Sequence, residues 1–415
     1  MPKNKLKKLE LLAPAGNLDK MKTALAFGAD AVYAGIPDFS LRVRINDFDL
    51  EKIKEATEYC HKRGKKIYIT ANIFAHNSHL DKLPKYIKKL KEIKIDALIV
   101  SDPGVLNLIK DIWPECVVHL STQANCTNWQ SAKFWFERGV KRVILGREVT
   151  LAEIKEIHKK VPKLELEYFV HGAMCMAYSG RCFLSKYYLD KSANLGDCVQ
   201  PCRWNYKIKS KKFICAENHE EDVFELVEEK HGSYILNSKD LCLIKYLREL
   251  ADAGVGSFKI EGRAKSAYYQ AVVAGIYSRA VHNLKSINKK EIDCFYNELY
   301  KKLVHRGYTT GFLLGEKADQ NLEKSHETSD WEFCGQVVKY TINKVFIKVH
   351  NCIKLGDKTE IVLPEYDIIS MTVEKMLDAE TGEEIKEAHG GQGMVVIMEV
   401  SKDVPEFSVV RRKIN

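Results

Sequence analysis

The first 285 residues repeat one short module, and this repetition is the strongest constraint on the fold. Each module has an apolar, β-prone run, a polar or glycine-bearing end, and an amphipathic helix. Residues 9–13 (LELLA), for example, lead through Pro14-Ala15-Gly16 into a helix-like segment. Similar short segments lead into several of the β-prone runs: GADAVYAG, KIDALIVSD, GVKRVILG and GVGSFKIEG. Alternating strands and helices of this length predict parallel strands joined by helical crossovers.

The module occurs often enough to close a barrel. We predict an α/β fold, a (β/α)8 TIM-like barrel, and keep a doubly wound open sheet as the alternative. One run in excess of eight is expected to be an extra or edge strand. The nine candidate strands are residues 9–13, 31–35, 66–72, 97–102, 117–124, 142–148, 165–172, 234–240 and 258–263.

The pattern of polar and apolar residues changes twice after the predicted barrel. Residues 1–285 are expected to form the barrel, with a cysteine-rich insertion at 171–215. Residues 286–330 are polar and predict a helical or irregular connecting arm. Residues 331–415 contain short apolar runs separated by turn signals, so they predict a small C-terminal β-barrel domain. Its expected task is either to dock the substrate or to cover the site.

Charge is unevenly distributed between these parts. Residues 331–415 carry 11 Lys and Arg against 14 Asp and Glu, a net of −3, so the remainder of this +9 chain carries +12. A basic body favours a polyanionic partner such as nucleic acid, although lysines spread over several helices also serve solubility alone. We expect a cytoplasmic protein without a membrane segment, because neither a signal peptide nor a long apolar run occurs.

Four of the twelve cysteines gather in one stretch, Cys175, Cys182, Cys198 and Cys202, spaced C-x6-C-x15-C-x3-C. Cysteines clustered in a cytoplasmic chain indicate metal ligands or reactive groups before disulfides. Structural zinc prefers two close pairs, whereas an iron–sulfur cluster accepts irregular spacings from a loop that wraps it. The spacing therefore favours the cluster. Zinc stays open, and so does a Cys–His hydrolase if the strand continues from His171 through Cys175.

Polar residues end most of the predicted strands. Active sites of (β/α)8 barrels form at the C-terminal ends of the strands, so these residues are candidates for binding substrate. Arg42 and Arg44, in the loop after the second strand, are candidates for contacts with RNA or a carboxylate, as are Lys207, Lys209, Lys211 and Lys212. The strand-end residues are Asn72, Asp102, Gln123, Arg147, Glu148, His171, Glu261 and Arg263. Each could also be a helix cap or a rim salt bridge.

Several motifs together resemble a known family along nearly the whole chain. They are ELLAPAGN at 10–17, GADAVYAG at 28–35, YFVHGAMCMAYSGRCFLS at 168–185, DCVQPCRW at 197–204 and IEGR at 260–263. With them, the chain resembles the collagenase-like peptidase family of unassigned catalytic class. That family also contains bacterial RNA hydroxylation proteins, and the chain looks most like the members that take part in forming 5-hydroxyuridine at the wobble position of tRNA.

The resemblance implies a chemistry and a set of partners. The four cysteines would hold a 4Fe-4S cluster, and His171 would either move a proton or orient a thiolate. Hydroxylation of tRNA would depend on prephenate, a small dicarboxylate that Arg147 or Arg263 could bind in two-point fashion. An electron donor or a paralogous partner protein is expected as well. The alternatives are a peptidase, hydroxylation of 23S rRNA by the same chemistry, and a zinc-stabilised RNA-binding barrel without catalysis.

Overall fold

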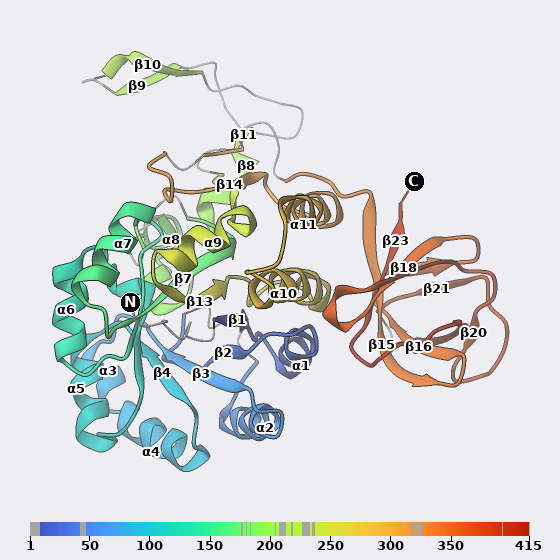
Figure 1. The fold of residues 1–415 in the computed structure, drawn as a ribbon, viewed down its shortest axis with the longest axis horizontal. Coiled ribbons are helices and arrows are strands. Elements are labelled where there is room, and N and C mark those ends of the chain that lie inside the picture. The colour runs from blue at the N-terminus through green and yellow to red at the C-terminus, as the bar shows by residue number, and fades with distance from the viewer. Residues whose placement is uncertain are drawn as a thin grey trace.

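The chain folds into a barrel of parallel strands followed by an antiparallel β domain (Figure 1). The computed structural model describes residues 9–41, 47–175, 177–179, 181–182, 184–203, 205–206, 213–216, 219–225, 233–234, 237–316, 319–321, 326–391 and 393–414. Among the helices of these residues, none has the length and apolarity needed to cross a bilayer.

Eight parallel strands, counted over the described residues, close the barrel and confirm the predicted TIM-like fold. Neighbouring strands pair in chain order, and β13 pairs with both β1 and β7 to complete the circle. The strands are buried almost throughout, as expected when helices cover the outside of a parallel sheet. They are β1 (Glu10–Pro14), β2 (Ala31–Gly35), β3 (Lys66–Ala71), β4 (Ala97–Val100), β5 (Val118–Leu120), β6 (Arg142–Ile144), β7 (Glu165–Gly172) and β13 (Val255–Ile260).

Helices surround the barrel, and local sequence marks where several begin. Asn17, Asp49, Asp102, Asn128 and Thr150 each accept a hydrogen bond from a backbone amide in the first turn of the following helix. The helices are α1 (Leu18–Ala26), α2 (Leu50–His61), α3 (Asn77–Leu80), α4 (Leu83–Ile93), α5 (Pro103–Ile112), α6 (Trp129–Glu137), α7 (Leu151–Lys160), α8 (Leu184–Leu189), α9 (Leu247–Asp252), α10 (Ala267–His282) and α11 (Lys289–Lys302).

The predicted run at residues 234–240 is not one of the eight barrel strands. The extra strand β12 (Asp240–Cys242) begins at its last residue and runs antiparallel to the last two residues of β7. A short strand from the arm, β14 (Tyr308–Thr309), pairs parallel with β12. Between β7 and β12 lie the cysteine-rich segment and the small strands β8 (Asn205–Tyr206), β9 (Phe213–Ala216), β10 (His219–Glu225) and β11 (Ser233–Tyr234).

The interior of the barrel holds charged side chains as well as apolar ones. Arg142 of β6 bonds to three carboxylates: Glu10 at 2.5 Å, Glu167 at 3.1 Å and Glu165 at 3.2 Å. Lys259 of β13 bonds to the other oxygen of Glu167 at 2.8 Å. The Glu167 side chain is fully buried, so its charge depends on these two cations for compensation.

The C-terminal domain is all β, as the sequence predicted. Its described residues form an antiparallel seven-stranded sheet and a two-stranded sheet, β17–β21, around one apolar core. The strands are β15 (Trp331–Thr341), β16 (Lys344–Val349), β17 (Cys352–Lys354), β18 (Lys358–Val362), β19 (Ile368–Thr372), β20 (Leu377–Asp378), β21 (Glu387–His389), β22 (Val395–Glu399) and β23 (Val409–Lys413).

A buried ion cluster joins the two domains. Arg411 of β23, fully buried, bonds to Glu298 of α11 at 2.9 Å and to Glu360 of β18 at 2.5 Å. Tyr366, in the turn after β18, packs in the same apolar core as the barrel helices and donates to Glu298 at 3.0 Å. The barrel and the β domain therefore share one continuous interior at this contact.

Replacing Arg142 should destabilise the barrel strongly. The change Arg142→Met leaves the Glu10 and Glu167 carboxylates buried without their guanidinium, and breaking such an ion cluster costs about 3–5 kcal/mol. Urea denaturation followed by circular dichroism measures the loss. As a control, Lys133→Met removes an exposed pair with Glu137 and should cost less than about 0.5 kcal/mol. A loss below about 1 kcal/mol for Arg142→Met would contradict the assigned role.

Candidate functional site at the barrel mouth

A cavity of about 670 Å³ lies at the C-terminal ends of the barrel strands; we call it the barrel-mouth cavity. Barrel residues such as Tyr33, Thr70, Ile99 and Phe169 form its floor and walls. The cysteine-rich segment after β7 and Phe312 of the arm cover it. This is the face at which (β/α)8 barrels carry out chemistry.

Gly172 lets the chain leave β7 at this point. Its φ is +111°, and a Cβ there would lie 2.4 Å from the carbonyl oxygen of Glu261. Only glycine combines that left-handed backbone with so close an approach to the end of β13. The chain can therefore turn across the barrel mouth, carrying Cys175 and the residues after it over the cavity.

All four predicted cysteine ligands line the barrel-mouth cavity. Cys175 and Cys198 are exposed, and Cys182 and Cys202 are half-buried. Cys175 follows β7, Cys182 precedes α8, and Cys202 lies in the short helical turn Pro201–Arg203. Segments separated along the chain thus deliver four sulfur atoms to one wall of the cavity.

Hydrogen bonds fix this segment to itself and to the barrel. The Ser185 hydroxyl lies 3.7 Å from Cys198 Sγ and accepts from the amide of Val199 at 3.2 Å. The amide of Phe74, just beyond β3, donates to the carbonyl of Asn194 at 3.1 Å. Glu148, at the end of β6, accepts from the Ser179 amide at 2.7 Å and from its hydroxyl at 3.2 Å.

The donor set fits an iron–sulfur cluster. Burial first, and then the neighbouring Cys175 and Cys198 sulfurs, raise the pKa of Cys182. Metal binding at such a site would release the proton of the thiol. A single tetrahedral zinc ion, with Zn–S bonds of about 2.3 Å, needs its sulfurs within about 4 Å of one another. No three ligand atoms of these cysteines, all of them described, lie within 4.8 Å. An iron–sulfur cluster distributes its ligands over separate iron atoms. The cluster and the zinc ion both stay predictions for these four cysteines.

The polar strand-end candidates also meet at the cavity. Of those named from the sequence, Asn72, Gln123, Arg147, Glu148, Glu261 and Arg263 line it. Asp102 instead caps α5 by accepting from Val105. Arg42, Arg44, Lys207, Lys209, Lys211 and Lys212 lie outside the described residues. The roles of the lining residues stay predictions.

Three of these residues make structural contacts as well. Arg263, almost fully buried, donates to the Ser40 hydroxyl at 2.9 Å and to the Leu41 carbonyl at 2.7 Å, which holds the loop after β2. Asn72 donates to Ser121 at 3.0 Å. Glu148 holds the Ser179 loop. The sequence allowed each of the three a structural role as a helix cap or a rim salt bridge, but it did not predict these hydrogen-bond partners.

Arg147 is a cation of the cavity lining whose guanidinium could meet a ligand. Its guanidinium stacks on the ring of Phe169 at 4.0 Å, and its Nε atom is buried without a hydrogen-bond partner among the described residues. A guanidinium beside an aromatic ring keeps N–H groups with which it can bind a carboxylate by two hydrogen bonds.

Lys259 lies in the lining of the cavity and was missed by sequence reasoning. It is 4% exposed and points between Glu167, 2.8 Å away, and the ring of Tyr33, 4.3 Å away. Burial lowers the pKa of Lys259, partly offset by Glu167. A lysine between Phe258 and Ile260, inside a predicted barrel strand, was the signal that could have identified it.

His171 lies apart from the cavity lining. Its ring is 2% exposed and lies 5.4–5.9 Å from the rings of Tyr269, Tyr277 and Tyr308, and its Nδ1 lies 3.3 Å from the Tyr277 hydroxyl. Burial lowers the pKa of His171 to about 3, so the imidazole is neutral at physiological pH. Because β7 ends at Gly172, the strand does not continue to Cys175, and the condition for a Cys–His pair is not met.

The buried His171 should make the fold sensitive to acid. Between pH 6.5 and 3 the unfolded chain takes up a proton at this position and the folded chain does not, so stability falls as pH falls. From pH 7 to pH 5 this contributes about 2 kcal/mol, and His171→Gln should remove that share. Urea denaturation at both pH values measures it. The exposed His76→Gln is the control, and an unchanged pH dependence in His171→Gln would contradict the assignment.

Comparison with known proteins places the chain in a family. Residues 16–323 match the model of peptidase family U32, and residues 329–411 match the model of the U32 C-terminal domain. Because the first match alone covers well over half of the chain, it identifies the family independently of any single relative.

Three relatives show the range of names that similar proteins carry. The tRNA hydroxylation protein P of Haemophilus influenzae is 39% identical over 96% of this chain and 94% of its own length. The 23S rRNA 5-hydroxycytidine C2501 synthase of Escherichia coli is 34% identical over 86% of this chain and 53% of its own. A collagenase of Porphyromonas gingivalis is 30% identical over 88% and 89%. The resemblance seen in the motifs is confirmed: this chain belongs to peptidase family U32.

Proposed function

We propose that this protein takes part in hydroxylating RNA, and that its target is the wobble uridine of tRNA, converted to 5-hydroxyuridine. The observation that carries the proposal is the meeting of four cysteines and Arg147 in the barrel-mouth cavity. Similarity over nearly full length to a relative named for tRNA hydroxylation, and to a 5-hydroxycytidine synthase, supports it.

Cys175, Cys182, Cys198 and Cys202 would hold a 4Fe-4S cluster against the cavity. Such a cluster supplies one-electron chemistry when it is bound. The surrounding residues orient it: Glu148 holds the loop between Cys175 and Cys182, and Ser185 contacts Cys198. An electron donor or a paralogous protein is the expected partner for electron exchange.

The cavity also suits a small anionic co-substrate. We propose prephenate, whose two carboxylates need cations in a confined space. Arg147 would bind one carboxylate with its guanidinium N–H groups.

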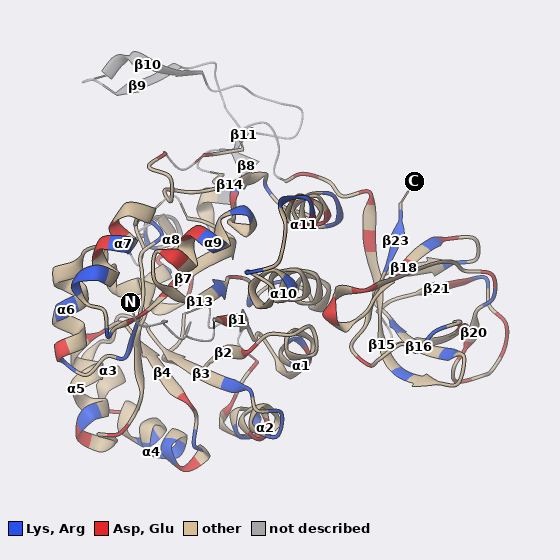
Figure 2. Ribbon diagram, in the orientation of Figure 1, with Lys and Arg blue, Asp and Glu red and all other residues tan. Residues whose placement is uncertain are grey.

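The RNA would reach this cavity from outside, guided by charge. Figure 2 shows Lys and Arg on α2, α4, α6 and α11 rather than gathered on one helix. Asp and Glu lie among these cations. Binding that rests on contacts between cations and phosphates weakens steeply with salt.

A peptidase is the competing function, in keeping with the family name and the collagenase relative. A cysteine peptidase needs a histidine beside its nucleophile. In this chain His171 packs among tyrosines, whereas Cys175 lines the cavity. These positions favour RNA hydroxylation over proteolysis.

Complementation tests the proposal. Nucleoside analysis of tRNA from a strain that lacks the gene and any paralogue should show loss of 5-hydroxyuridine derivatives. The wild-type gene and Cys294→Ser, which changes an exposed cysteine of α11, should restore them. Cys182→Ser should not. If tRNA were unaffected and 23S rRNA lost a hydroxylated base, the rRNA alternative would take its place.

Metal analysis of the same proteins separates the cofactors. After anaerobic purification, Cys294→Ser should contain as much iron and as much sulfide as the wild type. Cys182→Ser should contain little of either. Zinc without iron in the wild type would argue against the cluster. Protease activity that survives loss of all four cysteines would support the peptidase.

Arg147→Met should weaken binding of the dicarboxylate without unfolding the protein. Loss of a charge-assisted hydrogen bond costs about 1.5–3 kcal/mol, which corresponds to roughly 10- to 150-fold in Kd for prephenate measured by calorimetry. Arg138→Met is the matched control, since Arg138 also stacks on a phenylalanine, Phe134, at 3.6 Å but lies on an exposed surface. Equal affinities in both variants would show that Arg147 does not bind the anion.

A further inference from the structure

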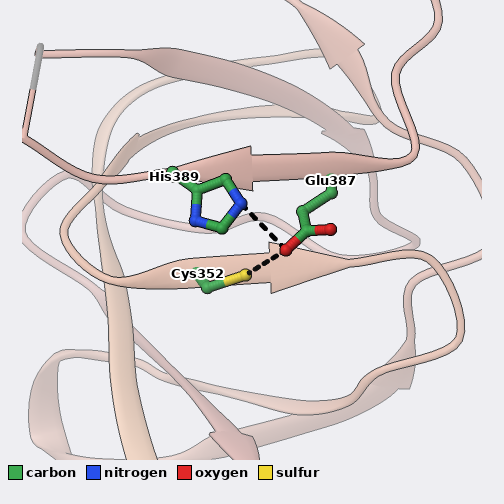
Figure 3. A group of neighbouring side chains, drawn as sticks. All are labelled: Cys352, Glu387 and His389. Atoms are coloured by element: carbon green, nitrogen blue, oxygen red, sulfur yellow. Dashed lines mark hydrogen bonds and ion pairs between the residues drawn. The ribbon is translucent and has the colours of Figure 1, made fainter.

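A second set of potential metal ligands lies in the C-terminal domain, on the two-stranded sheet of β17 and β21 (Figure 3). Cys352 of β17 stands directly opposite His389 of β21, and Glu387 lies two residues before His389. Residues two apart on a strand share a face. Ile353 and Ala388, between them, point into the apolar core, so the register turns Cys352, Glu387 and His389 outward together.

The three side chains already converge. The Cys352 sulfur lies 3.3 Å from Glu387 Oε1, and His389 Nε2 lies 2.8 Å from the same oxygen. Each offers one donor atom, and all three atoms lie within 4.8 Å of one another, closer than any other such set among the described residues. Tetrahedral zinc, with bonds of about 2.0–2.3 Å, requires donors about 3.3–3.8 Å apart. Small side-chain rotations would be enough.

We propose that Cys352, Glu387 and His389 form a binding site for a divalent transition metal ion, with Zn²⁺ as the best match. Thiolate and imidazole select borderline-soft ions over Ca²⁺ and Mg²⁺. Three protein ligands leave a fourth position for water. An ion there would join β17 to β21 through their side chains, in addition to the backbone pairing, and so stabilise the outer sheet of the domain.

A catalytic cysteine is the alternative use of these residues, and their arrangement opposes it. The His389 ring contacts the carboxylate rather than the thiol. Burial and the hydrogen bond to Glu387 raise the pKa of Cys352, whereas a nucleophile needs a lowered one. A bound cation reverses this balance, because it favours the thiolate and the carboxylate together.

Lys354 allows a test in which metal binding is expected to become stronger instead of weaker. It stands opposite Glu387 in the register, and its Nζ lies 2.7 Å from the same Oε1 atom. The ammonium group therefore pairs with the carboxylate oxygen that the ion would bind, and the two cations compete for it. Removing this competitor should strengthen metal binding, an outcome that a merely structural surface cluster would not give.

The experiment uses the full chain after chelator treatment, titrated with Co²⁺ and Zn²⁺. The wild type and Cys294→Ser should show the same thiolate-to-Co²⁺ absorption, and subtracting the spectrum of Cys352→Ser removes any contribution from the barrel-mouth cysteines. Cys352→Ser and His389→Gln should each weaken Zn²⁺ binding about 100-fold. Lys354→Met should strengthen it about two- to fivefold, the equivalent of an exposed ion pair.

The melting temperature gives a second measurement. Zn²⁺ should raise it in the wild type and in Lys354→Met, but not in His389→Gln, whose melting temperature without metal should equal that of the wild type. Binding by Cys352→Ser and His389→Gln with wild-type affinity would overturn the proposal. So would weaker binding by Lys354→Met. Because the site lies outside the barrel, its failure leaves the proposed RNA hydroxylation untouched.

Discussion

The parallel pairing of β7 with β13 closes the barrel, and the arrangement of the site follows from it. Every other pair of neighbours in the circle, except β13 and β1, is joined by a short crossover, whereas more than eighty residues separate the end of β7 from the start of β13. The excursion begins at the barrel mouth, where β7 ends, and finishes at the opposite end of the barrel, where the parallel strand β13 starts. Because β7 ends at the mouth, the residues that follow it start there, and their cysteines line the cavity beside the strand ends.

Much of this arrangement is visible in the sequence. The repeated module predicts the parallel strands, and parallel strands bring their C-terminal ends to one rim. Asn72, Arg147 and Glu261 could therefore be grouped from the sequence alone, and all three line one cavity. The long spacing between Cys182 and Cys198 did not obscure their proximity, because sulfur ligands from a loop need no regular period.

Other features depend on contacts that a linear pattern does not contain. The charged residues of the barrel interior lie on four different strands, and Arg142 meets Glu10 across 132 positions of the chain. The sequence shows these charged residues beside apolar ones in the predicted strands. It does not show which charged residues pair with one another. His171 was misleading for the opposite reason. Its neighbours in sequence include Cys175, whereas its neighbours in space are tyrosines from α10 and β14.

The buried Arg411 has a consequence for how a large ligand meets the protein. A guanidinium that bonds to carboxylates of α11 and of the β domain cannot be pulled into solvent by a small rotation, because the carboxylates would then stay buried and uncompensated. Movement of the β domain against α11 is therefore costly. A large ligand that contacts both of these parts meets them in a fixed relative orientation.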